Sequence, residues 1–123
     1  MFGIVNLTKR HPPRVVWQEI AERVLGKGYD MSLVFVGDAR SKALNRLYRK
    51  KNKPANVLSF PISPDMGEVV LNLKQAESEA RSLGINARRQ SAYLFIHGLL
   101  HLKGYRHGST MERTERELMS RFV

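Results

Sequence analysis

Three of the four histidines in this chain lie within one short segment, HGLLHLKGYRH at 97–107. His97 and His101 are four residues apart in an expected helix, so both rings leave one helix face with Cβ atoms roughly 6 Å apart. Two imidazole nitrogens at that separation can bind one cation at about 2.0–2.1 Å each. Gly104 can adopt a positive φ, end the helix and turn the chain back, which would bring His107 to the same point. Three neutral nitrogens with an open fourth position describe a catalytic zinc-type site.

A lone histidine is more often a core or capping residue than a ligand, and we expect His11 to be a surface residue. The spacing H-x3-H-x2-G-x2-H favours a metal instead, and it equals that of the metzincin peptidases, HExxHxxGxxH. Those peptidases carry a glutamate as general base at the second position, where this chain has Gly98. A metallopeptidase or another metal hydrolase is therefore the weaker of the functional interpretations.

The elements that must position these histidines follow from hydrophobic periodicity and from caps. Each expected strand is short, and the four cover residues 3–7, 31–37, 57–60 and 67–72. Five helices alternate with the strands. The first is expected from Pro12 and Pro13 to Gly26, and the second begins at an Asp38 cap and continues through Tyr48. The third runs from an Asn72 cap to residue 83, the fourth covers 87–103 after an Asn86 cap, and the fifth runs from a Ser109 or Thr110 cap to about residue 121. We expect one α/β domain over residues 1–123, with about four strands in a mixed sheet and about five helices.

Three more local expectations can be tested by a structure. In the first helix, Val15, Val16, Ile20 and Val24 recur at helical spacing and should face the core. The second carries Ala43, Leu44, Leu47 and Tyr48 on one side and basic residues on the other, and Tyr48 is a core candidate that could instead stack on an unpaired base. Pro61 and Pro64 should end the strand at 57–60, which could pair in antiparallel fashion with the strand at 67–72.

The charge of the chain points to a polyanionic partner. The 123 residues carry a formal net charge of +10, and no acidic residue occurs between Asp38 and Asp65. An ordinary solvated face mixes charges of both signs, so this interval favours contact with nucleic acid over mere solubility. The basic residues in it are Arg40, Lys42, Arg46, Arg49, Lys50, Lys51 and Lys53.

The composition also excludes several classes of protein. There is no cysteine, so disulfides and thiolate metal sites are impossible, which fits a reducing cytosol. The N-terminus does not have the basic and apolar regions of a signal peptide. The longest apolar stretch, at 92–102, is too short and too polar to span a bilayer. We therefore expect a cytoplasmic protein that does not contact a membrane.

Four segments together resemble a known family. HGLLHLKGYRH is similar to the motif HGxLHLxGYDH of the YbeY family of single-strand-specific endoribonucleases, the ribosomal RNA maturation factors of bacteria and organelles. LYRKKNKPANVLSFP at 47–61 is similar to YRxxDKPTDVLSFP of that family, and MGEVVLN at 66–72 to its LGDIVI segment. The tail MERTERELM at 111–119 resembles its glutamate-rich terminal helix.

The resemblance implies that His97, His101 and His107 bind a metal ion, expected to be zinc, and it assigns a functional role to Arg49 and to Glu68. A guanidinium matches phosphate oxygens, so Arg49 could hold the scissile phosphate rather than being one more surface charge. Glu68 could be a general base, orient a ligand histidine, or only form a structural ion pair.

The implied activity is a metal-dependent endoribonuclease that acts at the 3′ end of 16S ribosomal RNA and in ribosome quality control. The implied partners are RNA, the small ribosomal subunit and a ribosome-associated GTPase. Arg106 stands where the family has aspartate, so it could either add a phosphate contact or disturb a ligand ring. The other residues expected to bind RNA are Arg46, Lys50, Lys51 and Lys53. A non-catalytic ribosome-assembly factor with a structural metal is the remaining alternative.

Overall fold

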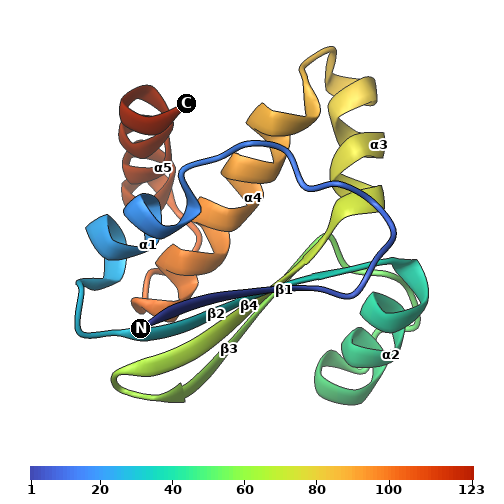
Figure 1. Cartoon of the computed structure of the whole chain (residues 1–123), viewed down its shortest axis with the longest axis horizontal. Helices are drawn as coiled ribbons and strands as arrows, with labels where there is room; N and C mark the ends of the chain where they lie inside the picture. The colour runs from blue at the N-terminus through green and yellow to red at the C-terminus, as the bar shows by residue number, and fades with distance from the viewer.

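A four-stranded mixed sheet separates two unequal layers of helices in the computed structural model, which describes all residues 1–123 (Figure 1). The strand order is β1-β2-β4-β3. The strands β1 (Phe2–Asn6), β2 (Asp30–Val36) and β4 (Met66–Asn72) run parallel, and β3 (Val57–Ser63) pairs antiparallel with β4 at the sheet edge. The predicted mixed α/β sheet is therefore confirmed.

The helices number five, as predicted: α1 (Trp17–Leu25), α2 (Asp38–Arg49), α3 (Leu73–Leu83), α4 (Ala87–Leu102) and α5 (Ser109–Phe122). Four of them cover one face of the sheet, with α4 in the middle, while α2 lies alone against the other face (Figure 1). No helix is long and apolar enough to cross a membrane.

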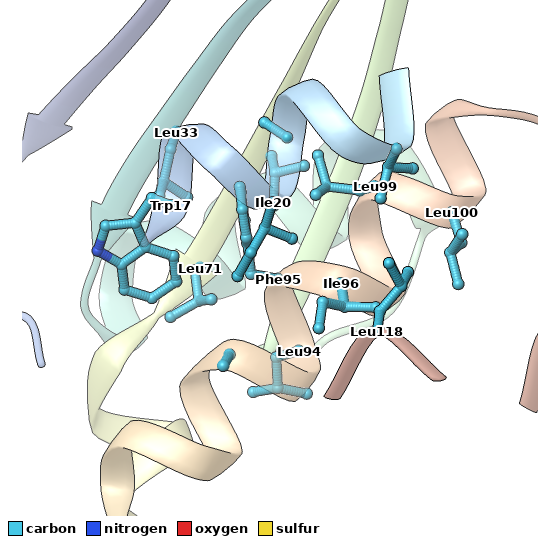
Figure 2. Close-up of a cluster of buried hydrophobic side chains, with 14 of the residues drawn as sticks. Trp17, Ile20, Leu33, Leu71, Leu94, Phe95, Ile96, Leu99, Leu100 and Leu118 are labelled. Atoms are coloured by element: carbon cyan, nitrogen blue, oxygen red, sulfur yellow. The ribbon is translucent and has the colours of Figure 1, made fainter. Parts of the chain in front are cut away.

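The core surrounds α4 because that helix is apolar on most of its circumference. Leu94, Phe95, Ile96, Leu99 and Leu100 are all at most 3% exposed and contact elements on several sides (Figure 2). A helix that is hydrophobic nearly all round belongs in the interior rather than on a surface. Consequently α4 is held on several sides, and the histidines that it carries have a rigid support.

Local caps fix both ends of the helices that lead to the site. The Asn72 side chain accepts a hydrogen bond from the Gln75 N–H at 3.2 Å, and the Asn86 side chain accepts one from the Arg89 N–H at 2.8 Å. Gly84, with a φ of 70°, follows α3 in the left-handed region. Both asparagine caps and the glycine stop are as predicted.

Three helix starts were predicted wrongly. The first helix begins at Trp17 rather than at the prolines, and Val16 before it is exposed and not helical. The Trp17 side chain is buried between the rings of Phe35 and Phe95. The cap of α2 is Gly37, and that of α5 is Gly108. Asp38 lies in the first turn of α2 instead, where hydrogen bonds from the Asn72 and Gln75 side chains lower the pKa of its carboxyl.

The apolar side of α2 is not its buried side, and the core candidate Tyr48 is exposed. Leu47 and Tyr48 are 69% and 62% exposed, whereas the polar Ser41 and Asn45 are buried. The Ser41 hydroxyl donates to the Ala55 carbonyl at 2.6 Å and accepts from the Ala55 N–H, and the Asn45 amide donates to the Lys53 carbonyl at 2.8 Å. The polar stripe is buried because α2 packs against the backbone of its own connection to β3.

The strand β3 does not end at Pro61 but continues to Ser63, with a register shift between these two residues. Because β3 is an edge strand, the missing N–H of a proline costs no hydrogen bond on the outer side. The added residues 61–63 are exposed, and α4 packs instead on Val57 and Ser59 in the first half of the strand.

Candidate metal centre

The structure brings the three predicted ligand histidines together. His97 and His101 project from α4, and His107 lies in the connection between α4 and α5. Their ring centroids are 4.6, 4.8 and 5.1 Å apart, and one nitrogen from each ring lies within 4.8 Å of the other two. Gly104, with a φ of 102°, makes the reversal of the chain that the sequence predicted.

Two of the rings are held by hydrogen bonds through their Nδ1 atoms. Nδ1 of His97 lies 2.7 Å from a carboxylate oxygen of Glu115, a residue of α5 that is only 4% exposed. Nδ1 of His101 lies 3.1 Å from the carbonyl oxygen of Tyr105. The Tyr105 carbonyl and a Glu115 carboxylate can only accept hydrogen bonds, so in the neutral rings that match these partners both Nδ1 atoms carry the proton. The Nε2 atoms are thereby left with free lone pairs, which is the state that binds a metal.

These residues fit a metal ion because the two Nε2 atoms lie 3.1 Å apart. With both protons on Nδ1, the two lone pairs face each other and cannot form a hydrogen bond. A cation between them removes that repulsion, and a tetrahedral ion with zinc–nitrogen bonds of about 2.05 Å sets its ligand nitrogens about 3.3 Å apart. Imidazole suits zinc but also copper, iron and nickel, so the ligand set indicates a transition metal without choosing one.

Electrostatics favour the neutral, metal-binding form of His101. Burial lowers the pKa of this histidine, and the neighbouring His97, His107 and Arg49 lower it further, against the opposing effect of the Tyr105 carbonyl. Arg49, at the end of α2, is therefore close enough to act on the site electrostatically. His107 is exposed, so the site is open to solvent on its side.

Gly98 explains why the peptidase base is missing. A Cβ atom at this position would lie 3.0 Å from the Ser59 hydroxyl, 3.1 Å from a methyl of Val69 and 3.2 Å from a methyl of Val57. The Ser59 hydroxyl also donates to the Gly98 carbonyl at 2.8 Å, so α4 packs tightly on β3 and β4 here. A glutamate here would require the neighbouring side chains to shift by a few tenths of an ångström, which argues further against a metallopeptidase.

The structure does not bring Glu68 to the histidines. Its cross-strand neighbour Phe60 packs with Leu58 and Val70 on the face of the sheet that α2 covers, whereas Val69 belongs to the core under α4. Successive side chains of a strand point to opposite faces, so Glu68 shares the α2 face. The carboxylate that is hydrogen-bonded to one of these histidines is that of Glu115, and the role of Glu68 stays a prediction.

Sequence reasoning missed Glu115, although a signal was present. Met111, Glu115 and Leu118 follow one another at helical spacing, and all three are buried in α5. A glutamate that interrupts an apolar helical stripe needs a hydrogen-bonded partner, since an unpaired buried charge costs several kcal/mol, on the order of 5 or more. The stripe thus indicated a partnered carboxylate, without saying which residue it would meet.

The residues expected to bind RNA are all exposed. Most of these residues lie on α2 or in the turn after it, and Arg106 directly precedes His107. None of these cationic side chains forms an ion pair with an acidic residue of the chain. Lys50 adopts the left-handed conformation, with a φ of 56°, where α2 ends. The free cations on and after α2 are Arg40, Lys42, Arg46, Arg49, Lys50, Lys51 and Lys53.

Comparisons with known proteins agree with these features. A family model described as endoribonuclease YbeY matches residues 8–122. The endoribonuclease YbeY of Aquifex aeolicus is 38% identical over 111 residues, which cover 83% of this chain and 74% of that protein. The one of Persephonella marina is 34% identical over 128 residues, which cover 98% of this chain and 80% of that protein.

Among solved structures, the solution structure of a Thermotoga maritima protein matches with a TM-score of 0.67. The match covers 97% of this chain and 87% of that protein, at 22% sequence identity. At that identity the likeness concerns the fold alone.

Proposed function

The chain belongs to the YbeY family of endoribonucleases, and on that premise we propose that it cuts single-stranded RNA in a metal-dependent reaction during ribosomal RNA maturation. The observation that carries the proposal is the convergence of three histidine nitrogens within 4.8 Å of one another. That site is open to solvent, and the exposed cations of α2 supply a surface for a polyanion.

We propose zinc as the ion and His97, His101 and His107 as its ligands. A bound ion of this kind supplies the positive charge that polarises a phosphoryl oxygen. Glu115 and the Tyr105 carbonyl hold two of the rings in the required tautomer, so the lone pairs are directed to one point before any ligand arrives.

Arg49 is proposed to stabilise the charge that develops on the phosphate during cleavage. Its guanidinium can donate two parallel hydrogen bonds to phosphate oxygens, and its charge already acts on His101. Arg46, Lys50, Lys51 and Lys53 are proposed to follow the RNA backbone, which would make binding salt-dependent. Arg106 is proposed to contact a phosphate beside His107.

The biological substrate is proposed to be the 3′ end of 16S ribosomal RNA, with a further role in ribosome quality control. The small ribosomal subunit and a ribosome-associated GTPase are proposed as partners, and the cytoplasm as the place of action, all from family membership. The general-base role that the sequence suggested for Glu68 stays a prediction, and its position on the α2 face gives it no support.

The proposal is tested by metal content, RNA cleavage and RNA binding in the same preparations. Wild-type protein should contain about one ion per chain by elemental analysis and should cut single-stranded RNA until a chelator is added. The variant His101→Ala should lose the ion and the cutting while staying folded and binding RNA, whereas His11→Ala is the matched control and should behave as wild type. Cutting that persists in His101→Ala would refute the proposal.

The same experiment separates an enzyme from a non-catalytic assembly factor. If His97→Ala and His101→Ala unfold the protein, the metal is structural and the assembly-factor interpretation gains. If the fold persists and only cutting is lost, the enzyme interpretation holds. The product ends then identify the attacking group, because 2′,3′-cyclic phosphates come from the RNA 2′-hydroxyl and 5′-phosphates come from water.

A further inference from the structure

Tyr48 is an aromatic residue that the protein holds in place but leaves uncovered. Its side chain lies on α2 and is 62% exposed. Its ring meets that of Phe60 edge-on, at a centroid distance of 5.1 Å and an interplanar angle of 63°. Phe60 is half-buried and packs against the small core formed by Val36, Leu58 and Val70. The Tyr48 ring is therefore anchored along one side only, and the rest of it faces solvent.

Although the acidic Glu68 lies on the same face of the sheet, opposite Phe60, cations dominate the chain around Tyr48. The residues that directly follow it, at 49–51, are all basic and exposed, and none of them forms an ion pair. An exposed aromatic ring among free cations is the combination that holds single-stranded nucleic acid, in which cations contact the phosphates and bases stack on the ring. Because these side chains are cationic and nucleic acid is anionic, the partner that binds at the Tyr48 ring is expected to be a nucleic acid rather than an apolar protein surface.

The position of Tyr48 in the chain relates it to the metal centre. Arg49, the residue proposed to stabilise the scissile phosphate, follows it directly at the end of α2. Adjacent residues of a helix are about 100° apart around its axis, so the ring and the guanidinium leave α2 in different directions from neighbouring positions. A base on the Tyr48 ring would therefore belong to the same stretch of RNA as the phosphate that Arg49 contacts, a short way along the strand.

We propose that Tyr48 is a stacking platform for an unpaired base next to the cleavage site. The inference rests on the proposed function and extends it to the choice of substrate. Both faces of a base inside a duplex are covered by its neighbours, so only an unpaired nucleotide can place its base on the ring. The platform gives this fold a physical reason to prefer single-stranded RNA, and stacking of this kind tolerates every base.

The kinetic test compares Tyr48→Leu and Tyr48→Phe with wild type on a single-stranded RNA. Loss of stacking to one base weakens binding by about 5- to 150-fold, so Tyr48→Leu should raise KM by that factor with kcat nearly unchanged. Tyr48→Phe keeps the ring and should restore the wild-type KM. The neighbouring Leu47 is exposed to a similar degree, so Leu47→Ala is the matched control and should leave both constants unchanged.

A spectroscopic test is independent of catalysis. In the holoprotein Tyr48→Trp, the emission of the new exposed tryptophan should be quenched by single-stranded RNA and not by a duplex of the same length. The native Trp17 is only 7% exposed, so wild-type protein gives the background signal. Thermal unfolding of each variant shows whether the contact with Phe60 has been lost instead.

The outcomes distinguish the two proposals. If wild-type protein does not cut RNA, the proposed function fails, and this inference fails with it. If wild-type protein cuts RNA, and Tyr48→Leu cuts with the wild-type KM or Tyr48→Trp shows no quenching, only the stacking role is overturned. A KM that rises equally in Tyr48→Leu and Tyr48→Phe also overturns it, because the hydroxyl and not the ring would then be responsible.

Discussion

Replacing Glu115 with glutamine is expected to weaken metal binding by about 10- to 100-fold, which equals about 1.4–2.7 kcal/mol. The carboxylate lies 2.7 Å from Nδ1 of His97 and is 4% exposed, so the hydrogen bond is charge-assisted and shielded from water. Glutamine keeps the size of the side chain. Its carbonyl oxygen can still accept the Nδ1 proton, but without the charge that makes such bonds roughly twice as strong as neutral ones. If its amide group faces the ring instead, the proton of His97 moves to Nε2 and a ligand atom is lost.

The assay is a competition titration in which metal-stripped protein and a chromophoric chelator share a limiting amount of Zn²⁺. Glu117 lies on the same helix and is exposed, so Glu117→Gln is the matched control and should bind zinc as tightly as wild type does. Circular dichroism of the metal-free proteins checks that α5 is still folded. A Glu115→Gln protein that is folded and has the zinc affinity of Glu117→Gln would refute the view that this carboxylate prepares His97 for the metal.

Three further predictions concern the rate, the fold and the salt dependence. Arg49→Ala should lower kcat for RNA cleavage by about 10²–10³, as loss of one donor to a developing charge typically does, while zinc affinity measured by competition should not fall. The variant Gly98→Glu would restore the peptidase motif. Its free energy of unfolding, measured in urea, should be lower by roughly 4 kcal/mol or more, because the added carboxylate is crowded and has no partner. A folded variant with peptidase activity would contradict this expectation. Replacing the basic turn with glutamines should reduce the slope of log Kd for single-stranded RNA against log salt by about 2, at about 0.7 per phosphate contact. The replaced residues are Lys50, Lys51 and Lys53.

The predictable part of the fold is the part that depends on local chemistry. The asparagine side chains at 72 and 86 cap the backbone three residues further on, and the glycines at 84 and 104 reach conformations that other residues avoid. Each of these events involves neighbours in the sequence, so the sequence alone predicted them. The exposed face of α2 was not predictable in this way, because a loop several residues further on covers the polar stripe of that helix.

The same distinction applies to the site. The ligand histidines were predicted because their spacing on one helix and past one glycine fixes where they meet. Glu115 lies 18 residues from His97, and only the packing of α5 on α4 brings the two together. For Glu68, the sequence could not tell which face of the sheet it occupies. The strand that carries it reads Val69, Val70 and Leu71 without alternation, because helices cover both faces.

The close approach of α4 to the sheet explains why a peptidase-like histidine spacing here serves a phosphodiester. A Cβ atom on Gly98 would lie 3.0–3.2 Å from Ser59, Val69 and Val57, so a side chain at this position requires these neighbours to move. The carboxylate of the site lies behind a ligand ring instead, where it is buried and cannot reach a substrate from the open side. The side chain whose charge acts on the histidines from elsewhere in the fold is the cation Arg49. An arginine near the three histidines attracts an anionic phosphate, and the Glu115 carboxylate that would oppose this attraction is buried behind His97. The position of Arg49 is therefore the feature of this site that suits the charged phosphate of RNA better than a neutral peptide bond.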